Sequence, residues 1–269
     1  MFDTVIEMLS YPFMTRAFLV GSLVALCSAL LGVSLVLKRY SMIGDGLSHV
    51  GFGAMAIAAA MNAAPLTVAI PVVIVAAILL LRISGNAKIK GDAAIALIST
   101  TSLAVGVMVI SLTTGMNTDV YNYMFGSILA MSAEDVKLSL VLSVFVLILF
   151  IVFYHKIFAI TFDETFARAT GVKAGVYNTL IAVLTAVTIV LGMRMMGALL
   201  ISSLIIFPAL TSMRVCRTFK SVIINAAVIS VVCLIAGVTL SYVAATPAGA
   251  SVVLANLVMM VLYLSLIHI

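Results

Sequence analysis

One short stretch, residues 44 to 53, places a carboxylate and an imidazole at the start of an apolar segment. Asp45 and His49 are four residues apart, so on a helix both side chains point to the same face. A carboxylate and a neutral imidazole are suitable ligands for Zn²⁺, Mn²⁺ or Fe²⁺, and the same two groups can begin a proton path. Because an ionisable side chain inside a membrane costs at least about 2.5 kcal/mol, such a residue usually has a partner or a function.

A purely structural role for this pair is the alternative. Asp45 would then cap a helix by accepting a hydrogen bond from the backbone N–H of Leu47 or Ser48, and His49 would bond a neighbouring carbonyl. Asp45 is also only six residues beyond Arg39, which places it nearer one end of the segment than its centre. The spacing alone leaves both roles open.

The segment belongs to a chain that is apolar almost throughout. Of its 269 residues, 65% are hydrophobic and only 9% are charged, which excludes a soluble globular domain and predicts a polytopic membrane protein. The net charge of +5 comes mostly from Lys and Arg in loops, which favours positive-inside orientation over nucleic-acid binding. The chain has no P-loop motif, so we expect it not to hydrolyse ATP and not to be an enzyme.

The hydropathy pattern predicts an all-α transmembrane bundle of eight or nine spans in a single domain over residues 1 to 269. The expected spans are 17–37, 47–63, 66–81, 93–113, 138–155, 176–192, 197–213, 221–243 and 249–267. Eight is the number if residues 176 to 213 form one broken helix. The positive-inside rule makes Lys38, Arg39 and the loop from Arg82 to Lys90 cytoplasmic, so the N-terminus is expected outside. Pro208 predicts a helix kink.

Residues 114 to 137 contain an apolar run that is too short to span comfortably. A re-entrant or broken helix fits this segment better, and non-helical backbone at membrane depth persists only beside protein or a water-filled cavity. Asp119 would stand at its outer entrance, either to receive a cation or as a solvated loop acid. The segment therefore predicts a position beside a transport pathway.

A polar island interrupts the apolar pattern at about residues 160 to 174. It includes Asp163, Glu164 and Arg168 on a short helical pattern that Gly171 ends, and the topology makes it cytoplasmic. A short amphipathic helix in this place suits docking by a soluble motor. An ordinary solvated loop is the alternative.

Several of these stretches resemble the membrane subunits of ATP-binding-cassette importers for zinc, manganese and iron. GDGLSHVGFG at 44 to 53 is similar to the family's Asp-Ala-Leu-Ser-His element, and FDETFARATGV at 162 to 172 to its cytoplasmic coupling segment. MMGALLISSLIIFPALTSMRV at 195 to 215 resembles its Pro-containing helix, and YNYMFGSIL at 121 to 129 a fourth element. Gly46 and Ser203 stand where the family usually has Ala.

The resemblance implies a permease that imports a divalent transition metal by alternating access in the bacterial cytoplasmic membrane. It implies a homodimer of this chain, two cytoplasmic ATP-binding subunits and an extracytoplasmic metal-binding protein, within membrane lipid and without nucleic acid. Zn²⁺ or Mn²⁺ would be cargo, with no permanently bound cofactor. Asp45 and His49 would bind or gate the metal, and a second set would couple to the ATPase: Asp163, Glu164, Phe166, Arg168 and Gly171. The alternative is an ion-gradient-coupled secondary transporter that uses Asp45 and His49 as a proton relay.

Overall fold

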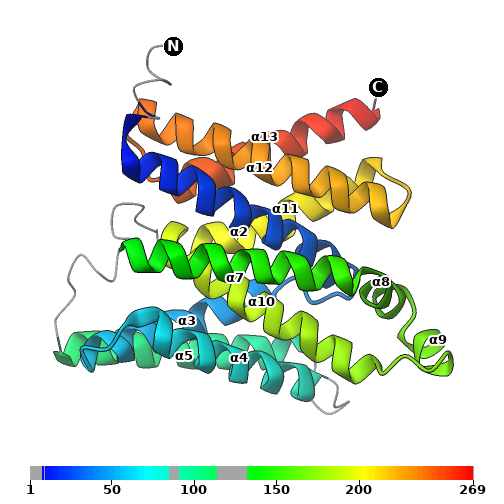
Figure 1. Cartoon of the computed structure of the whole chain (residues 1–269), viewed down its shortest axis with the longest axis horizontal. Helices are drawn as coiled ribbons and strands as arrows, with labels where there is room; N and C mark the ends of the chain where they lie inside the picture. Colours follow the sequence, from blue (N-terminus) through cyan, green and yellow to red (C-terminus); the bar gives the residue numbers. More distant parts are fainter. Residues whose placement is uncertain (1–7, 9, 85–90, 114–131, 269) are drawn as a thin grey trace.

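The chain forms a bundle of long, roughly antiparallel helices (Figure 1). The computed structural model describes residues 8, 10 to 84, 91 to 113 and 132 to 268, and this part of the chain contains helices and no strands. Nine of its helices are long and apolar enough to cross a membrane, which confirms the all-α prediction and the larger of the two expected span numbers. These are α2 (Pro12–Leu37), α3 (Ile43–Ala60), α4 (Pro65–Ser84), α5 (Gly91–Thr113), α7 (Ala133–Val152), α10 (Ala174–Met196), α11 (Ala198–Val215), α12 (Phe219–Ala244) and α13 (Ala248–His268).

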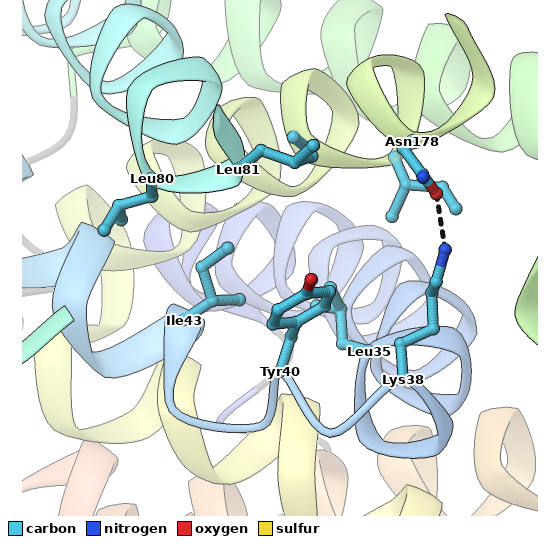
Figure 2. A pocket seen from close by; sticks show the side chains of 9 residues that line it. Leu35, Lys38, Tyr40, Ile43, Leu80, Leu81 and Asn178 are labelled. Atoms are coloured by element: carbon cyan, nitrogen blue, oxygen red, sulfur yellow. Dashed lines mark hydrogen bonds between the residues drawn. The ribbon is translucent and has the colours of Figure 1, made fainter. Parts of the chain in front are cut away.

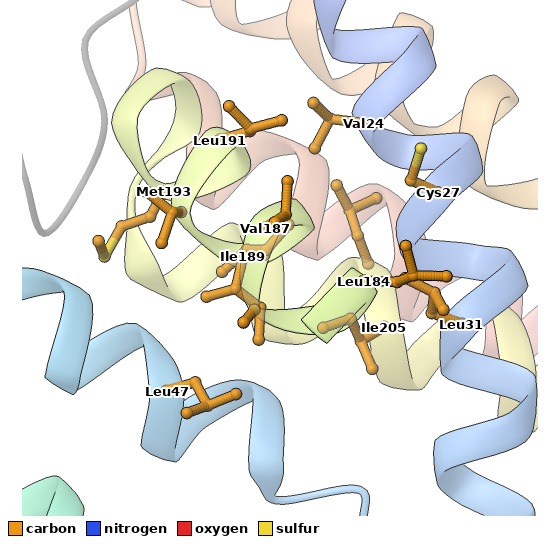
Figure 3. Close-up of a cluster of buried hydrophobic side chains, with 14 of the residues drawn as sticks. Val24, Cys27, Leu31, Leu47, Leu184, Val187, Ile189, Leu191, Met193 and Ile205 are labelled. Carbon is orange, nitrogen blue, oxygen red and sulfur yellow. The ribbon is translucent and has the colours of Figure 1, made fainter. Parts of the chain in front are cut away.

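The centre of the bundle is built by α2, α10 and α11, with α3 packed against them. Figure 3 shows this core, where Val24 and Leu31 of α2 meet Leu184 of α10 and Ile205 of α11. Leu47 contributes from α3 and is fully buried. A single residue, Gly197, joins α10 to α11 with a φ of 84°, a conformation that glycine adopts without steric cost. Residues 176 to 213 therefore contribute two spans, not one broken helix.

The least apolar span is also the most enclosed by protein. The mean hydropathy of α3 is 1.2, compared with 2.7 for α4, yet 72% of the α3 window is buried inside the chain and only 28% of the α4 window. A span that is surrounded by other helices has little lipid contact and tolerates small and polar residues. The helix that carries Asp45 and His49 thus has the composition of an interior element.

Several predicted boundaries change in the structure. Residues 133 to 137, expected in the re-entrant segment, are the first turns of α7, because Ser132 and Asp135 form a capping box there. The rest of that segment, 114 to 131 with Asp119, lies outside the described residues. The span expected to end at residue 155 stops at Val152, and a separate short helix, α8 (Tyr154–Phe162), follows. Pro208 lies inside α11, which continues as one helix from 198 to 215, and its kink stays a prediction.

The ends of several helices meet at one end of the bundle, on the right in Figure 1. Lys38, directly after α2, contacts Glu164 of α9 (Glu164–Ala169), and Leu37, Phe162 and Thr218 line one cavity. We call this end the α9 end.

Candidate functional site

The structure confirms that Asp45 and His49 share one face of α3. His49 Nε2 lies 3.7 Å from Asp45 Oδ2. Met42, not Asp45, is the N-cap of α3, and it makes no side-chain capping bond. The capping alternative for Asp45 is therefore wrong, although a carboxylate in the first turn still interacts favourably with the helix dipole.

The pair remains accessible within a helix that is otherwise mostly buried. The Asp45 side chain is 47% exposed and the His49 side chain 22% exposed, whereas Leu47, Ser48 and Val50 between and beside them are buried. Asp45 and His49 thus stand on the part of α3 that the described residues of this chain leave open. This arrangement leaves room for an ion, for water or for a second protein chain.

The helix geometry settles where the pair lies along α3. At about 1.5 Å per residue, Asp45 is about 3 Å and His49 about 9 Å along the axis from Ile43, where the helix begins. The whole of α3, with 18 residues, is about 27 Å long. Both side chains therefore lie in the third of the span nearest the α9 end.

Among the described residues, Asp45 and His49 are the two potential metal ligands at this place on α3. The described residues include no group of three or more His, Cys, Asp or Glu side chains that could hold one ion. Asp119, the third predicted metal residue, lies outside the described residues. A carboxylate and an imidazole without further protein ligands suit transient binding, because an ion that must pass cannot be held too tightly.

Close backbone packing against α5 fixes the position of α3. A Cβ on Gly53 would come within 2.7 Å of the backbone oxygen of Ser102, and a Cβ on Gly46 within 2.6 Å of Cγ2 of Ile95. The absence of a side chain at Gly46 thus leaves room for Ile95 on the facing helix. The glycines allow α3 and α5 to approach closely, as small residues commonly do between membrane helices.

The second candidate site is the polar island, which folds as α8, a one-residue link and α9. Asp163 is that link and caps α9, its Oδ1 accepting a hydrogen bond from the Phe166 backbone N–H at 2.8 Å. Gly171 follows α9 with a φ of 85°, as its predicted role as a helix stop requires. The island is therefore an ordered helical segment and not an irregular loop.

Glu164 is the centre of the polar contacts of this segment. It accepts hydrogen bonds from Arg168 Nη2 at 2.5 Å and from Asn178 Nδ2 at 3.0 Å, and it lies 3.3 Å from Lys38 Nζ. Lys38 also donates to Asn178 Oδ1, the bond drawn in Figure 2. We call Lys38, Glu164, Arg168 and Asn178 the Glu164 cluster. It joins α9 to the end of α2 and to the first turns of α10.

The groups in the Glu164 cluster shift each other's pKa values. Desolvation alone would raise the pKa of Glu164, but the hydrogen bonds from Asn178 and Arg168, together with Lys38, bring it below its ordinary value. Burial lowers the pKa of Lys38, and the neighbouring Glu164 opposes part of that effect. At neutral pH the cluster thus holds a charged carboxylate among its cations.

Two aromatic side chains near this cluster are exposed, although the ring of Phe162 also packs against Phe158 and Phe219. Phe166 is 66% exposed, and Phe162 is similarly open at the end of α8. Beside Phe162 is a cavity of about 230 Å³ that Leu37, Met213 and Phe219 also line. Exposed aromatic residues next to a hollow are typical of a protein contact surface.

Sequence reasoning missed Lys38 and Asn178 as parts of the second site. Both were visible as polar residues at the ends of apolar runs, but nothing in the sequence indicates that residues 38, 164 and 178 meet. The structure also pairs Asp135 of α7 with Arg194 of α10, 3.7 Å apart at the opposite end of the bundle. That pair was not predicted either.

Comparisons with known proteins identify the family of the chain. The sequence model of the ABC 3 transport family matches residues 10 to 267. The chain is 31% identical to the high-affinity zinc uptake system membrane protein ZnuB of Haemophilus influenzae, over 92% of this chain and 95% of the relative. It is 28% identical to the manganese transport system membrane protein MntC of Halalkalibacterium halodurans, over 92% and 85% respectively.

A solved structure extends this likeness to three dimensions. The structure described as PsaBC from Streptococcus pneumoniae in complex with Fab matches with a TM-score of 0.87 at 26% identity, covering 97% of this chain and 94% of the other. The resemblance drawn from the short motifs is thus confirmed over nearly the whole length. The chain belongs to the ABC 3 transport family, as a membrane permease.

Proposed function

We propose that this permease imports a divalent transition metal, zinc or manganese, by alternating access. The observation that carries the proposal is the Asp45 and His49 pair, 3.7 Å apart on the open part of α3. A carboxylate oxygen and an imidazole nitrogen suit both ions, and relatives named for zinc uptake and manganese transport support the choice. The ion is cargo and not a resident cofactor.

Membership of the ABC 3 transport family supports a set of partners for this chain. Because the described residues supply only two ligands at α3, a second copy of this chain would complete the pathway around the pair. Energy would come from two ATP-binding subunits that dock on the segment with Phe166, since the sequence has no P-loop. An extracytoplasmic metal-binding protein would deliver the ion to the other end of the bundle.

The distribution of basic residues supports one orientation in the bacterial cytoplasmic membrane. At the α9 end are Lys38, Arg39, Arg82, Lys156, Arg168, Lys173, Arg214, Arg217 and Lys220. Near the opposite end are Arg16, Lys137 and Arg194. By the positive-inside rule the α9 end is cytoplasmic, which puts the start of α2 on the outside.

Replacing His49 tests the metal site. In the complex reconstituted with its ATPase subunits and binding protein, we expect His49→Ala to assemble normally and to lower metal uptake at least about tenfold, the effect of losing ~1.4 kcal/mol of ion stabilisation. His155→Ala is the matched control, because His155 is exposed on α8. Unchanged uptake by His49→Ala would return His49 to a structural role.

Two further measurements define the energy source and the cargo. Metal uptake that persists in ATP-depleted vesicles under a proton or sodium gradient would contradict an ATP-driven importer and favour the proton-relay alternative. Comparing which divalent ions stimulate ATP hydrolysis in the reconstituted complex identifies the metal. Selection among such ions rests on geometry and availability as much as on ligand type.

A further inference from the structure

The Glu164 cluster lies one short link away from the helix that carries Asp45 and His49. Residues 38 to 42 are all that separates the end of α2 from the start of α3, and Lys38 is both the first residue of this link and a member of the cluster. The two candidate sites, more than one hundred residues apart in sequence, are therefore joined through five residues. We call residues 38 to 42 the α2–α3 link.

Backbone hydrogen bonds restrict the conformation of the α2–α3 link. Arg39 adopts a φ of 61°, its N–H bonds Val36 O at 3.0 Å, and the N–H of Tyr40 bonds Leu35 O at 2.8 Å. These two bonds form a Schellman motif, which normally places glycine where Arg39 stands. The next turn closes at once, because the Ile43 N–H bonds Tyr40 O at 3.0 Å. Displacing Lys38 would thus move the start of α3 as well.

Lys38 is the member of the cluster best placed to transmit such a displacement. Its side chain is only 11% exposed, and it contacts Glu164 of α9 and Asn178 of α10 at the same time. Separating a largely buried, hydrogen-bonded ion pair leaves each charge without a partner, which costs free energy. Lys38 and Glu164 therefore move together more readily than they separate. Lys173, an exposed cation at the same end of the bundle, makes no side-chain hydrogen bond or ion pair with the described residues.

A small cavity beneath the link leaves space for this movement. It has a volume of about 30 Å³, enough for a water molecule, and Lys38, Tyr40 and Ile43 line it together with Leu80 and Asn178 (Figure 2). The link and the first residue of α3 therefore border a gap on the side that faces α4 and α10. A tightly filled site would resist the same shift.

We propose that Lys38, held by Glu164 and Asn178, passes movements of the α9 segment through the α2–α3 link to the helix of Asp45 and His49. Lys38 is then a positioning residue for the metal site, acting without touching the metal. The proposal rests on the function proposed above, since it takes the ATPase subunits to act on α9. The movement would reach α3 through Lys38 and the α2–α3 link, at the cytoplasmic end of α3.

The test separates transport from ATP hydrolysis in the complete complex, reconstituted in vesicles. We expect Lys38→Met to lower the metal transported per ATP hydrolysed at least about tenfold, equivalent to ~1.4 kcal/mol of lost coupling. Lys173→Met, which removes an exposed cation from the same end, should leave that ratio unchanged. Lys38→Arg, which keeps the charge, should restore most of it.

A charge exchange keeps the test decisive if Lys38→Met assembles poorly. The double variant Lys38→Glu with Glu164→Lys restores an ion pair between the same positions, so it should transport more metal per ATP than either single variant. A ratio unaffected by Lys38→Met, or a double variant no better than the singles, would overturn the relay. If the wild-type complex itself fails to take up metal, the proposed function is what fails.

Discussion

The two candidate sites are held in place in opposite ways. Asp45 and His49 touch through one contact of 3.7 Å on an open face, and their helix is positioned by backbone packing at Gly46 and Gly53. The Glu164 cluster is held by several short hydrogen bonds between charged and polar side chains. At Asp45 and His49, the helix is held by close packing while the two side chains make little contact with each other. In the Glu164 cluster, the side chains are hydrogen-bonded directly to each other.

This difference fits what each site has to do. An ion in transit must exchange protein ligands for water at both ends of its path, so strong preformed contacts between the ligands would oppose binding. Contacts that connect a moving segment to the bundle must persist while the segment moves. Charge-assisted hydrogen bonds suit this role because they are roughly twice as strong as neutral ones. The contacts thus fit the roles proposed for the two sites, metal binding for the first and transmission of movement for the second.

Adding a methyl group at Gly53 should break the frame of the first site. The Cβ would meet the Ser102 backbone oxygen at 2.7 Å, and a backbone atom cannot rotate away as a side chain can. We expect Gly53→Ala to cost about 1–3 kcal/mol of stability by overpacking, to separate α3 from α5 and to abolish metal uptake. Thermal unfolding in detergent and uptake in vesicles measure these two effects.

Gly175→Ala is the matched control, because a Cβ there meets nothing within 4 Å and α10 is helical at that point. Its stability should stay equal to wild type or rise slightly through better helix propensity. Equal stability of Gly53→Ala and Gly175→Ala would show that close α3–α5 packing does not hold the metal helix in place.

Replacing Gly171 should act directly on the second site. Its φ of 85° costs other residues about 1–2 kcal/mol, while a Cβ there has open space, so the whole effect comes from the backbone. We expect Gly171→Ala to weaken ATPase binding up to about tenfold and Gly171→Asn to have a smaller effect, since Asn tolerates this conformation better. Titrating the permease with isolated ATPase subunits measures it. Unchanged ATPase binding by Gly171→Ala would contradict a docking role for the segment that Gly171 ends.

The sequence was sufficient to predict the membrane spans and the shared face of Asp45 and His49, because both depend on patterns within a single segment. Apolar runs predicted eight or nine spans, of which the described residues contain nine, and the spacing of Asp45 and His49 predicted a shared face. Gly171 likewise ends its helix as its position indicated.

Long-range contacts were beyond the sequence. Lys38, Glu164 and Asn178 come from three segments, and their meeting depends on how α2, α9 and α10 pack as whole helices. The close approach of Ile95 to Gly46 also became visible only in the structure. Each of these depends on packing between helices, which a pattern within one segment does not encode.

Acidification should have the smallest effect of these changes. It tests whether the charge of Glu164 stabilises the folded protein. Because the pKa of Glu164 is lower in the folded protein than its ordinary value of 4.5, its stabilising contribution is present above about pH 4.5 and is lost as the pH falls through the folded-state pKa. Glu164→Gln lacks this contribution at every pH. We therefore expect the variant to unfold at a lower temperature than wild type near neutral pH, and the two curves to converge on acidification. A difference in Tm that stays constant would show that Glu164 stabilises by shape and not by charge, and the Glu164 cluster would then not be an ionic joint.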